Sequence, residues 1–131
     1  QFDFIYSYSV FTHLSEENHI RWLKELARIL KPNGVMLHSV KSPLALRRME
    51  LFSPENLLKY RDNSIKNYET DISYHYIVDN PSNPEYGQTI INKDYILKNW
   101  PVYSGLKIID FQEGLIEAYP EGCHDLILMG K

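Results

Sequence analysis

Residues 2–40 read FDFIYSYSVFTHLSEENHIRWLKELARILKPNGVMLHSV, and this stretch decides the fold. Phe2–Tyr6 is a short aromatic and β-branched run without strict polar alternation, which is typical of a strand covered on both faces. Ser15 follows as a helix N-cap, with two glutamates in the first turn, where the helix dipole favours acidic side chains. Val35–Val40 is a second apolar strand. The stretch therefore predicts a βαβ unit with two parallel strands.

The helix of this unit has one apolar face. Its apolar residues recur at helical spacing, and one more widens the stripe: Ile20, Leu23, Ala27 and Leu30, with Leu26 beside them. Pro32 is expected to stop the helix, because proline removes a backbone N–H and clashes with the preceding turn. Asn33 and Gly34 are expected to form the following turn, since both tolerate a positive φ.

The middle of the chain reads as two short helices and a hairpin. Ser-Pro pairs open the helices, expected over Pro43–Leu51 and Pro54–Arg61, because proline suits the first helical position. Two strands, Ile72–Val78 and Gln88–Ile91, are separated by a loop rich in Pro and Asn. This arrangement predicts a hairpin.

The last third continues the sheet. Asn92 is expected to cap a helix that runs through Trp100, with Pro101 ending it. Leu106–Phe111 and Asp125–Met129 are strands with no helix between them, which favours antiparallel pairing. We therefore expect one α/β domain over residues 1–131. Its sheet is mostly parallel with an antiparallel C-terminal strand, and residues 42–91 form an insertion.

Composition narrows the class of protein. The chain is 44% hydrophobic and 24% charged, with a net charge of -3 and one cysteine. Because no basic run occurs, we expect no nucleic acid and no membrane as partners. The single cysteine suits a reducing compartment, so a cytoplasmic protein is expected. The chain begins with Gln1 rather than Met, which predicts a fragment or a processed chain.

Two motifs in these elements resemble a known family. The segment Phe2–Leu14, with SVFTHL after the strand, is similar to the fourth strand and following loop of class I methyltransferases, which use S-adenosylmethionine (SAM). The turn Leu30–Gly34, LKPNG, resembles the L-K-P-G-G turn before their fifth strand. Asp110–Lys131 is similar to their closing hairpin of strands. The resemblance implies a partial Rossmann-like sheet, the C-terminal half of such a domain, with residues 42–91 as an acceptor-substrate lid.

The chain departs from this family at the SAM-binding loop. The family holds SAM on a Gly-rich loop after the first strand, where the backbone approaches the ligand closely. No G-x-G-x-G stretch occurs in this chain. SAM is therefore the cofactor that the resemblance implies for the complete enzyme, and we do not expect this chain alone to bind it tightly.

Ligands of open α/β sheets bind beyond the carboxyl ends of the strands, which here nominates Tyr6–Val10 and Ser39–Ser42. By the resemblance, the loop after the first strand passes the methionine part of SAM, so the candidate cofactor-binding residues are Ser7, Tyr8, Ser9 and Val10. The alternative is that the two serines satisfy loop backbone groups while Tyr8 packs.

His13 is the candidate acid–base residue, because imidazole titrates near neutral pH. The alternative is a buried histidine that holds the loop by a hydrogen bond. The candidate acceptor-binding residues lie in the insertion, which forms a lid in this family: Tyr74, His75, Tyr76 and Tyr86. The alternative for these is ordinary hairpin packing. No Cys/His spacing predicts a metal site.

Two functions follow. The first is a SAM-dependent methyltransferase acting on a small-molecule acceptor, present here as a C-terminal fragment or as a divergent short form. In either case we expect this chain alone to be inactive. The second is a non-catalytic α/β module for interaction or dimerisation. In the family's strand order, Phe2–Tyr6 pairs with a strand that has no counterpart here. An unpaired apolar edge is a template for association, so this edge predicts a homo-oligomer.

Overall fold

The computed structural model describes residues 1–52, 55, 72–115 and 124–131. In chain order these residues form β1 (Phe2–Ser7), the 3-10 turn η1 (Phe11–His13), α1 (Glu16–Ile29), β2 (Leu30–Val40), α2 (Pro43–Phe52), β3 (Tyr74–Val78), β4 (Gly87–Ile91), α4 (Lys93–Ser104), β5 (Lys107–Leu115) and β6 (His124–Gly130). None of the described helices is long and apolar enough to cross a bilayer.

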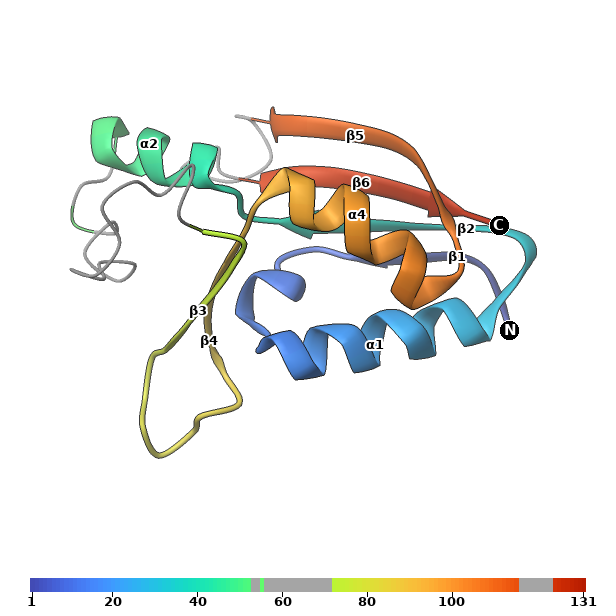
Figure 1. Cartoon of the computed structure of the whole chain (residues 1–131), viewed down its shortest axis with the longest axis horizontal. Coiled ribbons are helices and arrows are strands. Elements are labelled where there is room, and N and C mark those ends of the chain that lie inside the picture. The colour runs from blue at the N-terminus through green and yellow to red at the C-terminus, as the bar shows by residue number, and fades with distance from the viewer. Residues whose placement is uncertain (53–54, 56–71, 116–123) are drawn as a thin grey trace.

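The main sheet has the strand order β1-β2-β6-β5 (Figure 1). β1 and β2 pair in parallel, whereas β6 runs antiparallel to both β2 and β5. β1, β2 and β5 therefore point one way and β6 points the other. This confirms the predicted mixed α/β sheet with an antiparallel C-terminal strand.

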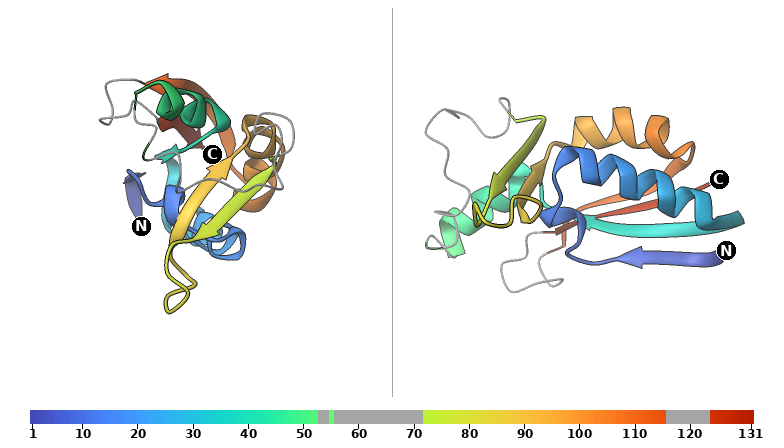
Figure 2. Two further views of the ribbon diagram at one scale, coloured as in Figure 1. Left: turned by 90° about the vertical axis from the view of Figure 1, so that its left-hand side faces the viewer. Right: turned by 90° about the horizontal axis from the view of Figure 1, so that it is seen from below.

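Helices α1 and α4 lie side by side on one face of this sheet (Figure 2). The apolar stripe predicted for α1 faces the sheet, with Leu23 and Leu30 fully buried. Burial of one such side chain contributes about 1.5–3 kcal/mol. The buried core consists of Phe11, Leu23, Ala27, Leu30, Met36, Val40, Ile91, Tyr95, Ile96, Trp100, Leu106, Ile127 and Met129.

Both predicted helix caps are present. The Ser15 hydroxyl accepts a hydrogen bond from the backbone N–H of Asn18, at 3.4 Å, and two glutamates occupy the first turn of α1. The Asn92 side chain accepts from the N–H of Asp94 at 2.8 Å and caps α4. These local signals locate the helix starts because the first N–H groups of a helix have no intrahelical partner.

The prediction that Pro32 ends the helix and begins a turn was wrong. α1 already ends at Ile29, and Pro32 lies within the long strand β2. Neither Asn33 nor Gly34 has a positive φ. Gly34 has a different role: a Cβ there would lie 2.9 Å from the Leu30 side chain and 3.1 Å from the Asp3 carbonyl oxygen. A side chain at position 34 would therefore crowd Leu30 and the backbone of β1.

The end predicted for α4 was also wrong. Pro101 lies inside the helix, which continues to Ser104. The last turn is fixed from both ends, because Trp100 is fully buried and Gly105 closes the helix in the left-handed region at φ 69°. The Gly105 N–H donates to the Pro101 carbonyl at 2.9 Å. Packing and the glycine cap therefore outweigh the hydrogen bond that proline cannot donate.

The insertion contains the predicted helix α2 and the predicted hairpin of β3 and β4. The hairpin is a separate two-stranded sheet that projects from the main body at the end opposite the termini (Figure 1). The predicted helix Pro54–Arg61 lies outside the described residues, apart from Glu55. Most of the predicted connection Gly114–Gly122 also lies outside them, and its first two residues belong to β5.

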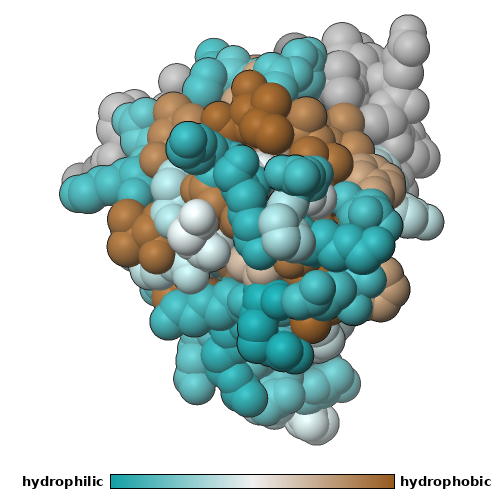
Figure 3. All heavy atoms as spheres, turned by 90° about the vertical axis from the view of Figure 1, so that its right-hand side faces the viewer, coloured by the Kyte–Doolittle hydropathy of each residue, from teal (hydrophilic) through white to brown (hydrophobic). Residues whose placement is uncertain are grey.

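The described helices that pack on β1 cover only one of its faces. Ile5 packs against the core, so Phe4 and Tyr6 point to the opposite face by strand alternation. Phe2, Phe4 and Tyr6 are 55%, 52% and 71% exposed. Figure 3, which views the end of the molecule where both termini lie, shows brown apolar atoms at the surface among hydrophilic atoms in teal. The expectation of a strand covered on both faces is thus not met within the described residues.

The core makes one stability prediction. Leu23→Ala should lower the free energy of unfolding by about 2–5 kcal/mol, because it removes a fully buried side chain and leaves a cavity. Leu97→Ala is a matched control on α4, where Leu97 is 43% exposed, and should change it by about 0.5 kcal/mol. Denaturant unfolding measures both values, and equal losses would contradict this assignment of the core.

Candidate functional site

Three strand ends meet at one edge of the sheet. β1 and β2 end there at Ser7 and Val40, and the antiparallel β6 starts there at His124. α2, η1 and the hairpin gather around this edge, away from both termini (Figure 1). Carboxyl ends of parallel strands are where ligands of open α/β sheets bind, so this edge is the candidate site.

The loop after β1 is fixed to β2 by its serines. Ser7 Oγ lies 2.7 Å from His38 Nδ1, and the Ser9 N–H donates to Ser39 Oγ at 2.8 Å. Tyr8 and Val10 are instead 40% and 46% exposed. The predicted cofactor residues therefore divide into two serines that anchor the loop and two side chains that face outward.

His124 belongs to this edge although the sequence analysis did not select it. Its Nδ1 lies 3.0 Å from Ser39 Oγ, and its ring stacks on Tyr8 with 4.9 Å between centroids. The antiparallel pairing of β6 with β2 brings it there, 85 residues from Ser39. The only sequence signal was the predicted antiparallel last strand, which does not specify the register.

The contacts of His13 are those of its alternative role, a histidine that holds the loop by a hydrogen bond. Its Nδ1 lies 2.7 Å from the Gly87 carbonyl oxygen, and its ring stacks on Tyr86 at 4.7 Å with an interplanar angle of 11°. Gly87 begins β4, so His13 joins η1 to the hairpin. The Gly87 position also requires glycine, since a Cβ would lie 2.1 Å from the Ile77 carbonyl oxygen.

The predicted acceptor residues are not brought into one cluster by their described contacts. Tyr74 donates its hydroxyl to the Leu14 carbonyl at 2.8 Å, and its ring packs on His19 and Tyr95. The Tyr76 hydroxyl donates to Pro84 within the hairpin. His75 lies between these two tyrosines on β3, so strand alternation directs it to the other face. Tyr86 is 49% exposed, and its ring stacks on that of His13, which follows the loop after β1.

Two imidazoles lie buried beneath the edge. His19 and His38 are fully buried, and both rings pack on Phe11 and Trp100. Burial, followed by the nearby His38, lowers the pKa of His19 to about 3, and burial lowers the pKa of His38 to about 4. Both are therefore neutral at pH 7 and act as polar members of the core.

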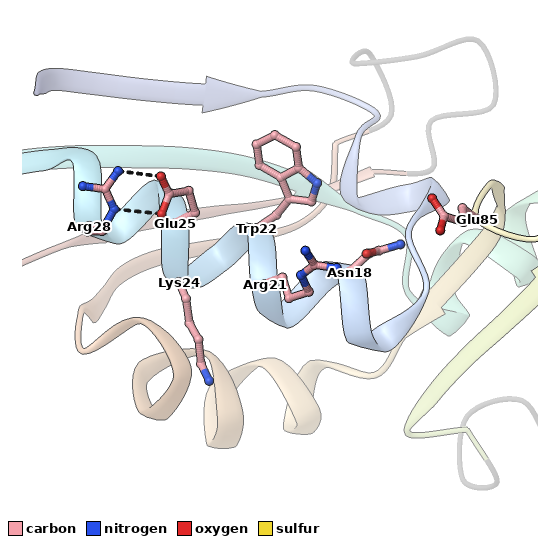
Figure 4. Close-up of a pocket in the computed structure, with 7 residues that line it drawn as sticks. All are labelled: Asn18, Arg21, Trp22, Lys24, Glu25, Arg28 and Glu85. Atoms are coloured by element: carbon pink, nitrogen blue, oxygen red, sulfur yellow. Dashed lines mark hydrogen bonds and ion pairs between the residues drawn. The ribbon is translucent and has the colours of Figure 1, made fainter.

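A separate groove along the outer side of α1 does not form a site. Asn18, Arg21, Trp22, Lys24, Glu25, Arg28 and Glu85 line it. Figure 4 shows Glu85 on the hairpin and the other side chains spread along α1, with Trp22 directed toward β1 and Lys24 away from it. Arg28 is occupied by a bidentate pair with Glu25, at 2.6 and 2.8 Å. The groove lacks convergent polar groups, unlike the strand-end edge.

Comparison with known proteins finds one family whose model matches part of the chain. The sequence model of the methyltransferase domain family matches residues 1–38, which include β1, the loop, α1 and most of β2. No curated protein sequence matches the chain. The family match confirms the predicted resemblance and covers two of the three segments that carried it, Phe2–Leu14 and Leu30–Gly34.

Among solved structures, the chain is similar to the glycopeptide N-methyltransferase MtfA complexed with (S)-adenosyl-L-methionine. The TM-score is 0.53 and the sequence identity is 13%. The match covers 97% of this chain and 55% of that one, so the chain spans about half the length of that enzyme. At this identity the likeness shows the fold, and the predicted methyltransferase-like α/β architecture is thus confirmed.

The buried imidazoles predict how stability depends on pH. In the unfolded chain they titrate near pH 6.5, so below that pH the unfolded state binds more protons than the folded state. Stability is fully present above about pH 6.5 and falls as the pH drops toward the folded-state pKa values. When the pH is lowered from about 7.5 to about 5, each of these imidazoles should reduce the free energy of unfolding by about 2 kcal/mol.

Denaturant unfolding at several pH values measures this slope. His19→Leu removes one titrating group, so its stability should fall less steeply with pH than that of the unsubstituted chain, whatever its stability at pH 7.5. Parallel pH profiles for the two proteins would show that His19 does not titrate as its burial requires.

Proposed function

We propose that this chain is the C-terminal half of a SAM-dependent methyltransferase domain and forms one wall of its SAM site. The observation that carries the proposal is the Ser7–Val10 loop, held at the carboxyl ends of two parallel strands. The matching family region, residues 1–38, contains this loop. The similar solved enzyme is a SAM complex, which supports the same cofactor.

The residues of the loop suit one part of SAM. Tyr8 and Val10 offer an aromatic and an aliphatic surface at the outer side of the loop. These can pack on the methionine part, while the serines keep the backbone in place. The chain has no G-x-G-x-G loop to approach the rest of the cofactor. The fit is therefore partial, and the other wall has to come from a complementary segment.

The hairpin of β3 and β4 is the proposed lid on the acceptor side. It is tied to the loop region by the His13–Gly87 contact and by two hydroxyl groups, of Tyr74 and Thr89, that donate to the Leu14 carbonyl. Tyr86 lies on its exposed side and is the proposed contact for a small-molecule acceptor. Tyr74 instead holds the lid in place.

Titration of the 131-residue chain with SAM tests this proposal. Calorimetry should give no appreciable heat at micromolar SAM, because one wall of the site cannot hold the whole cofactor. At millimolar SAM, NMR should show shifts of the Tyr8, Ser9 and Val10 amides. L-Methionine should shift the same amides, and adenosine should not.

The two failures of this test are distinct. Micromolar affinity for SAM would show that the site is complete without a Gly-rich loop. Unchanged loop amides at millimolar SAM would show that this loop is not a SAM wall.

A second candidate function is self-association through β1. β1 is an edge strand, and Phe2, Phe4 and Tyr6 are all more than half exposed on one of its faces. An apolar groove lies between β1, the loop after it and α1, and is lined by Ile5, Tyr6, Ser7, Val10, Phe11, Trp22 and Leu26. Exposed apolar edges associate readily, so we propose that the isolated chain pairs with a second copy at this strand.

Light scattering over a wide dilution series tests self-association. The chain should form dimers, and Phe4→Glu should weaken them by about tenfold or more, equivalent to about 1.4 kcal/mol, because it places like charges on the two strands that pair. Val102→Glu is a matched control on α4, where Val102 is 77% exposed. A chain that stays monomeric throughout, or equal effects of the two substitutions, would exclude association through β1.

A further inference from the structure

Ser9 has a backbone conformation that serine rarely adopts. Its φ is 58°, the only positive φ of a non-glycine among the described residues. The left-handed region places the Cβ close to the following carbonyl, so such a residue persists where its surroundings hold it. Ser9 lies in the middle of the loop that faces the candidate site.

Ser39 holds Ser9 in this conformation. It is fully buried on β2, and its hydroxyl oxygen accepts a hydrogen bond from the Ser9 N–H at 2.8 Å. On the other side, Ser9 Oγ lies 3.2 Å from Thr12 Oγ1 in η1. The loop is therefore fixed at its centre by one bond to the sheet and one to the turn that follows.

His124 completes the arrangement from β6. Since Ser39 Oγ accepts from Ser9, its own proton needs an acceptor, and among the described contacts that acceptor is His124 Nδ1 at 3.0 Å. This assigns a neutral imidazole with its proton on Nε2. Burial, then the charges of Lys41 and His13, lower the pKa of His124 to about 4, so it stays neutral at pH 7. Its ring also stacks on Tyr8.

We propose that Ser39 and His124 are positioning residues that set the shape of the Tyr8–Ser9 loop for its ligand. Ser39 fixes the Ser9 amide, and His124 both orients the Ser39 hydroxyl and supports the Tyr8 ring from below. Both residues lie outside the segment that matches the methyltransferase family, residues 1–38. The identity of the ligand, the methionine part of SAM, rests on the proposed function, whereas the shape of the loop does not.

Hydrogen exchange and ring contacts in the 131-residue chain test the shape of the loop. Ser39→Ala should speed exchange of the Ser9 amide by about five- to tenfold, because the amide loses its only described acceptor. The amides of Met36 and Ile127, in the core strands, should not change. The nuclear Overhauser contacts between Tyr8 and His124 should weaken in this variant.

Two further variants separate positioning from general destabilisation. Ser9→Gly added to Ser39→Ala should restore the Tyr8–His124 contacts, since glycine adopts a positive φ without strain. His124→Asn keeps an acceptor near the position of Nδ1 and should retain slow Ser9 exchange, whereas His124→Ala should not. The imidazole nitrogen shifts of His124 should report a proton on Nε2.

The SAM response adds a readout that a purely structural role would not produce. Millimolar SAM should shift the Tyr8 and Ser9 amides of the unsubstituted chain. It should not shift them in the Ser39→Ala variant. In the double variant, with Ser9→Gly added to Ser39→Ala, the shifts should return. Unchanged Ser9 exchange in Ser39→Ala, or a proton on His124 Nδ1, would overturn the proposed positioning. If the unsubstituted chain shows no SAM shifts while the exchange results hold, the proposed function fails and the loop assignment stands.

Discussion

The pairing of β2 with β1 on one side and β6 on the other is the constraint on which the site depends. β2 is parallel to β1 and antiparallel to β6, so the end of β1, the end of β2 and the start of β6 lie at one edge. Ser39, on β2, contacts the loop after β1 and His124 of β6 through a single hydroxyl group. A shift of β6 by one residue would turn His124 to the other face and break this connection, because strand side chains alternate.

The elements with strong local signals could be predicted from the sequence. Ser15 and Asn92 mark helix starts because capping depends on a few neighbouring residues. The predictions at Pro32 and Pro101 failed because tertiary contacts outweighed local preference. β1 pairs with Leu30 and again from Val35, so Pro32 lies in an irregular part of β2 between the two paired positions. The burial of Trp100 holds the last turn of α4 past Pro101.

The candidate site was predictable only in part, for a related reason. The rule that ligands bind beyond the carboxyl ends of strands selects the loop from its position in the chain alone. The partners of that loop are set by register and by hairpin docking, which depend on contacts between distant segments. The place of His124 in the candidate site could therefore not be predicted from the sequence. His13 was selected for its titration range, whereas its stacking on Tyr86 and its bond to Gly87 give it a structural role at the hairpin.

The exposed surface of β1 can be covered in two ways, by a second copy of the chain or by a complementary segment. Two copies that pair along β1 would satisfy the backbone groups of that edge. Such pairing extends the sheet sideways, so Phe4 and Tyr6 gain only cross-strand neighbours and no helix covers them on the face opposite α1 and α4. A complementary segment that adds both a strand and a helix would cover the edge and this face together. The same segment would lie next to the Ser7–Val10 loop, where the proposed SAM site needs its second wall. Under the two proposals, the isolated chain pairs with itself along β1, whereas a complementary segment would cover the apolar face and complete the proposed site together.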